Sequence, residues 1–161
     1  MLTLAYGISF LSLLSNIIAM MCEDRQTACE ARMAAMVLRS AAAICFGEYG
    51  LSAIYCVLTF AMLITCQDFG RLRPYAVLIC WGGLLLSAAA GGILLHVPLM
   101  IAAGWLLHQI FCRRRSPVPD SIAYTVLGAA SFLAGDYITA ACLVVHVVVT
   151  LVNGVVSGVH A

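Results

Sequence analysis

The chain contains very little charge. Of its 161 residues only 9% are Asp, Glu, Lys or Arg, whereas 64% are hydrophobic. A soluble domain has roughly a quarter of its residues charged, so this composition argues against a water-soluble fold and for solvation by lipid. Lysine is absent, and the net charge is only +1. No basic surface of the kind that binds nucleic acid is therefore expected.

Several sequence motifs are also missing. The eight cysteines contain no C-x-x-C pair, the motif expected of a membrane disulfide-exchange enzyme. The four histidines show no i, i+3 or i+4 pairing, so no metal, haem or other cofactor site is predicted. No catalytic constellation is found. No N-x-S/T sequence occurs, so we expect no N-linked glycan.

Long apolar runs fill most of the sequence and predict an all-α integral membrane protein with a single transmembrane domain, residues 1–161. A helix of about 20 apolar residues crosses the ~30 Å hydrocarbon core. The first run lacks a basic leader and a small-residue cleavage site, so we interpret it as a retained span. The predicted bundle has four transmembrane helices, at about residues 2–21, 41–66, 76–95 and 121–156, with polar links at 22–39, 67–75 and 113–120.

Residues 76–112 carry no charge, but they are too many for one span and few for two. Pro98 predicts a break. Residues 97–112, with Trp105 and His108, then form an interfacial segment, a re-entrant segment or a fifth span. Residues 121–156 allow one long tilted helix, because two would need a hairpin at Gly135-Asp136 and a first arm too short to span.

Arginine positions leave the orientation open. With four spans, Arg71 and Arg73 lie on one side, and the arginines of residues 25–39 and 113–115 lie on the other. With five spans, Arg71, Arg73 and the cluster 113–115 share the cytosolic side. Neither count produces the large asymmetry that the positive-inside rule uses.

Glu48 and Asp136 are the acids inside predicted spans. A charged group at that depth is unfavourable by roughly 2.5–3.5 kcal/mol and normally faces the bundle interior or water. One interpretation is a proton or ion relay, with His96 or His146. The alternative is a structural carboxylate that fixes helix packing or lies near an interface. The internal repeats that solute transporters usually show are not evident.

Small residues recur at four-residue spacing in two spans and predict close helix packing, within the chain or with a partner. The two small-residue faces are Gly83, Ser87 and Gly91, and Ser131, Gly135 and Thr139 beside Asp136.

Among the cysteines, Cys22 and Cys29 share the first link and could form a disulfide if that link is lumenal. Cys112 and Cys66 are candidates for palmitoylation at the membrane edge.

Two stretches carry a resemblance to a known family. The first is a basic loop, Arg71-Leu72, followed by Ala76 and by Trp81-Gly82 at the start of a small-residue span. The second, within residues 127–140, reads Leu-Gly-Ala-Ala-Ser, then Ala134, Asp136, Thr139 and Ala140. In these features, and in their order, the chain resembles the multispanning egress protein of alphaherpesviruses, over about residues 50–153. Family members carry a longer segment before the first span.

The resemblance implies a non-enzymatic envelope protein that forms a complex with glycoprotein K. Each of the two proteins depends on the other for transport to the cell surface. It also implies roles in virion egress and cytoplasmic envelopment, and in control of cell fusion driven by glycoprotein B. The family is found in the virion envelope and in host Golgi, endosomal, nuclear and plasma membranes. It has four spans and cytosolic termini.

Two alternatives remain open. One is a small multispanning transporter or proton-relay protein that uses Glu48 and Asp136. The other is a host vesicle-trafficking protein of the MARVEL type, which shares the four-span architecture and a hydrophobic last span ending near His146.

Overall fold

The structure is a computed structural model that describes residues 2–67, 72–91, 93–112 and 117–159, with side chains except those of 25, 88–91, 93–96 and 153–159. These residues form helices and no strand, which confirms the all-α prediction. The helices are α1 (Leu2–Met21), α2 (Arg25–Phe46), α3 (Tyr49–Cys66), α4 (Arg73–Gly91), α5 (Ile93–Cys112), α6 (Pro117–Leu133) and α7 (Tyr137–Val159).

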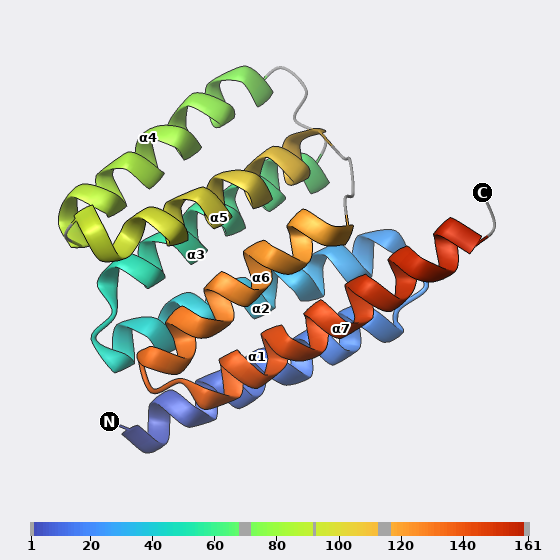
Figure 1. Ribbon diagram of the computed structural model, residues 1–161, viewed down its shortest axis with the longest axis horizontal. Coiled ribbons are helices and arrows are strands. Elements are labelled where there is room, and N and C mark those ends of the chain that lie inside the picture. The colour runs from blue at the N-terminus through green and yellow to red at the C-terminus, as the bar shows by residue number, and fades with distance from the viewer. Residues whose placement is uncertain (1, 68–71, 92, 113–116, 160–161) are drawn as a thin grey trace.

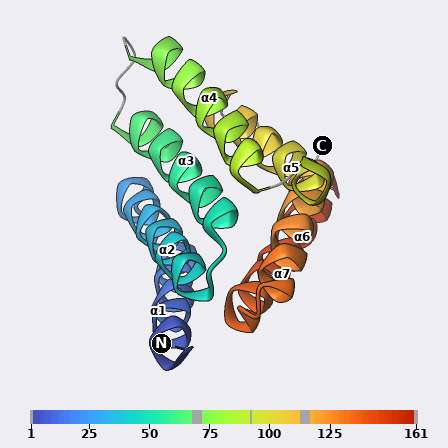
Figure 2. The same ribbon diagram turned by 90° about the vertical axis from the view of Figure 1, so that its left-hand side faces the viewer.

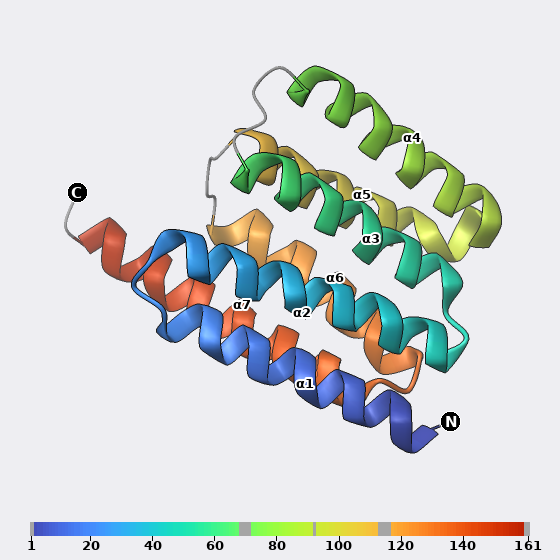
Figure 3. The same ribbon diagram turned by 180° about the vertical axis from the view of Figure 1, so that it is seen from behind.

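Consecutive helices run antiparallel to each other (Figure 1). The helices α1 to α4 follow one another in a first layer, and α5 to α7 form a second layer beside it (Figure 2). The helix α3 contacts α5, and α1 contacts α7, so the two layers meet along their length. The first and last described helices therefore lie side by side, as the reverse view also shows (Figure 3).

The predicted span at 41–66 is two helices, and the predicted link at 22–39 is largely helical. Gly47 ends α2 in the left-handed conformation, with φ 85°, and its N–H bonds to the carbonyls of Ala43 and Ile44. Only glycine adopts this conformation without strain. The helix α2 starts early because Asp24 caps it through Thr27 and the following residues are rich in alanine.

The predicted helix at 121–156 is likewise divided, at the Gly135-Asp136 hairpin. Gly135 has φ 84°, its N–H bonds to the Phe132 carbonyl at 3.0 Å, and the Asp136 N–H bonds to the Ser131 carbonyl at 2.9 Å. These two hydrogen bonds form the pattern of a Schellman motif at the end of a helix. The first arm is longer than expected because α6 begins at Pro117, inside the predicted loop, where proline suits a first helical turn.

The helix break predicted at Pro98 is wrong, because Pro98 lies inside a helix. The helix α4 ends at Gly91, and α5 begins at Ile93 and continues through Pro98. Residues 97–112 are thus part of a 20-residue helix, packed against α4 and α6. The stretch is therefore helical as far as Cys112 and continuous with the residues before Pro98.

Two of the described helices, α1 and α3, are long and apolar enough to cross a membrane. Shorter apolar stretches occur in α4, α5 and α7. Large apolar side chains fill the core between the layers, among them Tyr55, Leu84 and Leu107, each at most 1% exposed. The core also encloses polar and charged side chains, which is the feature that leads to the candidate site.

A buried polar cluster as the candidate functional site

A group of polar side chains lies between the layers where α1, α2, α3, α6 and α7 meet. Each member is at most 4% exposed to solvent. We refer to it as the polar cluster, and it consists of Ser9, Asn16, Arg39, Tyr55, Ser131, Asp136, Thr139 and Cys142.

Asp136 anchors the cluster at the start of α7. Its Oδ1 accepts a 3.0 Å hydrogen bond from the Thr139 N–H, which makes Asp136 the N-cap of the helix. Its Oδ2 accepts a 2.9 Å hydrogen bond from the Ser9 hydroxyl of α1. The partial positive charge of the helix start and these two donors together compensate the buried carboxylate. Nearby, the Tyr6 hydroxyl donates to the Gly135 carbonyl at 3.0 Å.

Arg39 is the second charged member, and its contacts are unusual. Its Nη2 lies 3.2 Å from the Cys142 Sγ, and its Nη1 lies 4.0 Å from the Met36 Sδ. The Asn16 Nδ2 also donates to the Cys142 Sγ, at 3.1 Å. The Arg39 Nε is buried and has no hydrogen-bond partner among the described residues. A guanidinium held mainly by sulfur is poorly satisfied, because sulfur is a weak acceptor.

Tyr55 extends the cluster from α3 to α6. Its hydroxyl lies 3.2 Å from the Ser131 Oγ, and its side chain is 1% exposed. Sequence reasoning missed Arg39 and Tyr55: the first stands in a stretch that appeared to be a polar link, and the second is one of six tyrosines. An isolated arginine in an alanine-rich helical stretch was the available signal.

Of the two predicted intramembrane acids, Asp136 alone belongs to the cluster. Glu48 is exposed and stands in the turn between α2 and α3, so the prediction that it lies inside a span is wrong. Among the predicted relay partners, His146 packs edge-on against Tyr124 with ring centroids 4.8 Å apart. The side chain of His96 lies outside the described residues.

The Gly83, Ser87 and Gly91 face packs within the chain. A Cβ added at Gly83 would lie 2.9 Å from the Val57 Cγ2, so α4 approaches α3 closely there. Ser87 is buried, and its hydroxyl donates to the Leu84 carbonyl at 2.7 Å and contacts the Met100 Sδ of α5 at 3.6 Å. The surroundings of Gly91 lie outside the described residues.

The predicted face of Ser131, Gly135 and Thr139 does not exist as one helix face, because the turn at Gly135 separates its members. Ser131 belongs to α6, Gly135 to the turn and Thr139 to α7. Ser131 and Thr139 nevertheless meet in the polar cluster, since the two helices fold back on each other.

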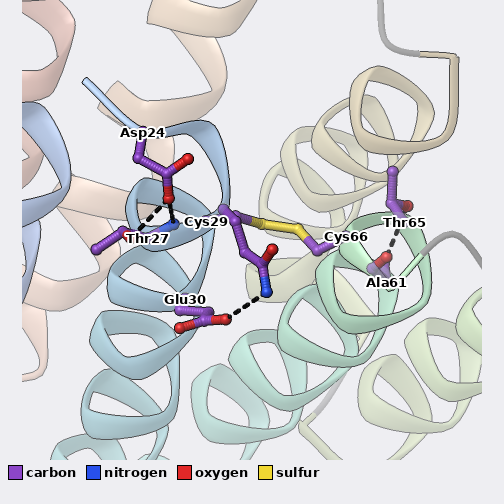
Figure 4. The surroundings of a disulfide bond; sticks show 8 residues. Asp24, Thr27, Cys29, Glu30, Ala61, Thr65 and Cys66 are labelled. Atoms are coloured by element: carbon purple, nitrogen blue, oxygen red, sulfur yellow. Dashed lines mark hydrogen bonds between the residues drawn. A yellow bond between two sulfur atoms is a disulfide. The ribbon is translucent and has the colours of Figure 1, made fainter. Parts of the chain in front are cut away.

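The cysteines pair differently from the prediction. A disulfide joins Cys29, near the start of α2, to Cys66, the last residue of α3 (Figure 4). The Cys22–Cys29 bond, which was considered for a lumenal link, is therefore not formed, and while the Cys29–Cys66 disulfide is present Cys66 has no thiol for palmitoylation. Cys22 and Cys112 are free. Cys112 is exposed, with its Sγ 3.6 Å from the His108 Nδ1, and remains a palmitoylation candidate.

The cluster can hold charge and fix the relative positions of five helices. In the described part of the chain, no three His, Cys, Asp or Glu side chains are placed to bind a metal ion. Comparisons of the chain with protein-family models, curated proteins and solved structures found no match. The argument for function therefore depends on the residues and their geometry.

Proposed function

We propose that this chain is a multispanning membrane protein whose helices cross the bilayer in alternating directions. The observation that carries this proposal is the distribution of arginine. The end of α1 and the start of α2 lie at the same end of the bundle as the corresponding ends of α3 and α4 and of α5 and α6 (Figure 1). The sequence between or directly beside these helix ends contains six of the eight arginines, and Arg32 follows about two turns inside α2. The connections at the other end contain none. Arg39, the eighth, is buried.

Side-chain exposure supports the same proposal. On the outer face of α4, Leu78, Leu85 and Leu86 are between 67% and 73% exposed, while Arg39 and Asp136 are at most 4% exposed. Apolar residues outside and ionisable residues inside suit lipid as the solvent.

Under this proposal the arginine-bearing end faces the cytosol, as the positive-inside rule requires. The orientation that four or five spans left open then follows from the alternating helices. The Cys29–Cys66 pair lies at the same end, where the cytosol keeps thiols reduced. We therefore expect the pair to be a dithiol in the cell and to form its bond on oxidation.

Glycosylation tags test the orientation, because the natural sequence has no acceptor site. A short tag with one N-x-S/T site is added before residue 1 in one variant and after residue 161 in another. Glycosylation of the N-terminal tag alone supports the proposal. Two unmodified tags would indicate the family topology with both termini in the cytosol, and a modified C-terminal tag alone would invert the orientation.

We further propose that the protein acts without catalysing a reaction, as the partner of glycoprotein K in an alphaherpesvirus-type egress complex. Its seven described helices, alternating in direction, would place the termini on opposite sides of the membrane, which departs from the four spans and cytosolic termini of that family. What supports this is the resemblance at Arg71-Leu72, Trp81-Gly82 and residues 127–140. The resulting role covers transport of both proteins to the cell surface, cytoplasmic envelopment and control of fusion by glycoprotein B. The small residues Gly83 and Ser87 are already packed internally, so contacts with the partner use other surfaces.

Co-expression with a candidate glycoprotein K tests this role. Retention of each protein in the endoplasmic reticulum when alone, with joint arrival at the Golgi and cell surface, is the expected result. Independent transport of this chain would contradict it.

The Asp136→Asn variant distinguishes the proposed egress function from the competing relay function. Loss of ion flux with intact targeting would favour a relay, whereas joint loss of targeting and function favours the egress complex.

A further inference from the structure

The environment of Arg39 provides donors but few acceptors. Arg39 is 2% exposed, and arginine stays protonated in proteins. Its closest acceptors are the sulfurs of Cys142 and Met36, and its Nε has no partner in the described part of the molecule. A buried charge is costly unless it is paired and hydrogen-bonded.

Asp136 does not supply the missing counter-charge directly. Both of its oxygens already accept hydrogen bonds, one from the Thr139 N–H and one from the Ser9 hydroxyl. Its negative charge is thereby placed against the positive start of α7. Within the described residues no Arg39 nitrogen lies within ion-pair distance of a carboxylate.

Thr139 provides a second unsatisfied donor, on the side of α7 that carries Cys142. It precedes Cys142 by three residues, so the two share a helix face. The hydroxyls of Thr59, Thr65 and Thr125 donate to the carbonyl four residues earlier. The corresponding carbonyl for Thr139 is that of Gly135, which accepts from the Tyr6 hydroxyl. The Thr139 Oγ1 is buried, and no described residue bonds to it.

We propose that Arg39, Asn16 and Thr139 form a buried binding site for a small monovalent anion such as chloride. The site would offer a guanidinium, an amide N–H and a hydroxyl. The Cys142 sulfur now accepts from two of these donors, so its side chain turns away when the anion binds. A monatomic anion satisfies several donors at once and neutralises Arg39. The site lies within the chain and is independent of the proposed partner.

Chloride-dependent stability tests the site. The purified full chain in detergent is unfolded by heat while sodium gluconate is replaced by sodium chloride at constant ionic strength. An anion that binds only the folded state raises the unfolding temperature along a saturating curve. We expect this rise in the natural protein and its loss in Arg39→Met. The matched control is Arg32→Met, which removes an arginine from the same helix and should keep the rise.

Thr139→Val keeps the test decisive if Arg39→Met does not fold. Loss of one hydrogen bond of about 1 kcal/mol should raise the half-saturating chloride concentration about fivefold. Thr59→Val, which removes a hydroxyl bonded to its own helix, should leave that concentration unchanged.

A direct readout is the broadening of the chloride-35 resonance by the protein, which should disappear in Arg39→Met. No chloride response in the natural protein, or the same response in every variant, would overturn the proposal and leave water as the partner of these donors.

Discussion

The hydroxyl of Ser9 donates a 2.9 Å hydrogen bond to Oδ2 of Asp136, a residue 127 positions further along the chain. This bond joins the first described helix to the beginning of the last. Because Asp136 also caps α7 through its other oxygen, one carboxylate both starts a helix and fixes that helix against α1. Its importance for folding can be separated from any role in ion transfer.

Replacing Asp136 with alanine should destabilise the fold by about 1–2 kcal/mol, because α7 loses its cap and Ser9 loses its acceptor. Asp136→Asn retains a capping oxygen and should be less affected. Ser9→Ala should lose about 1 kcal/mol. Reversible unfolding in detergent measures all three, and equal stability of the alanine and asparagine variants at Asp136 would contradict the capping role.

Gly83 and Gly82 form a matched pair for testing helix packing. A Cβ at Gly83 would lie 2.9 Å from the Val57 side chain, whereas one at Gly82 would have no described atom within 4 Å. Gly83→Leu should therefore lower stability by about 1–3 kcal/mol through overpacking, and Gly82→Leu should have little effect. Val57→Ala should partly restore the Gly83→Leu variant. Thermal unfolding measures the difference, which would vanish if α3 and α4 did not approach here.

The positive φ of Gly135 gives a different prediction, since there is open space around it. Gly135→Ala should destabilise by about 1–2 kcal/mol because a Cβ is strained in the left-handed conformation. Gly135→Asn should lose less, as asparagine enters this conformation more readily. Comparable unfolding temperatures for both variants and the natural protein would show that the turn tolerates a side chain.

Asp24 gives the first turn of α2 a dependence on pH. The hydroxyl and backbone N–H of Thr27 both donate to its carboxylate, and these bonds lower the pKa of Asp24. A lowered pKa in the folded state means that the cap stabilises fully above the ordinary pKa and is lost as pH falls through the lowered value. Amide exchange in this turn should therefore accelerate as pH falls below the ordinary pKa of an aspartate, after correction for intrinsic rates. Asp24→Asn should abolish this acid-dependent step.

The sequence predicted helices and excluded strands correctly, but it misjudged where helices end. Gly47 and Gly135 stop helices inside runs that look continuous by hydropathy, because a single left-handed residue leaves the apolar pattern unchanged. The charges before Arg39 likewise concealed an amphipathic helix. Of the polar cluster, Ser131, Asp136 and Thr139 were predicted as contact residues. For Arg39 the sequence offered only a lone arginine in an alanine-rich stretch, and for Tyr55 it offered nothing. Their burial depends on distant neighbours, since Arg39 contacts Cys142 of α7 and Tyr55 contacts Ser131 of α6.

The contact between α1 and α7 has a consequence for biosynthesis. Ser9 and Asn16 of α1 bond to Asp136 and Cys142, whose codons are translated 127 and 126 positions later. At about 5–20 residues per second, those partners emerge roughly 6 to 25 s after α1. During that interval the nascent helix carries unsatisfied polar side chains. The polar side chains of α1 therefore find their partners only after nearly the whole of the described chain has been synthesised.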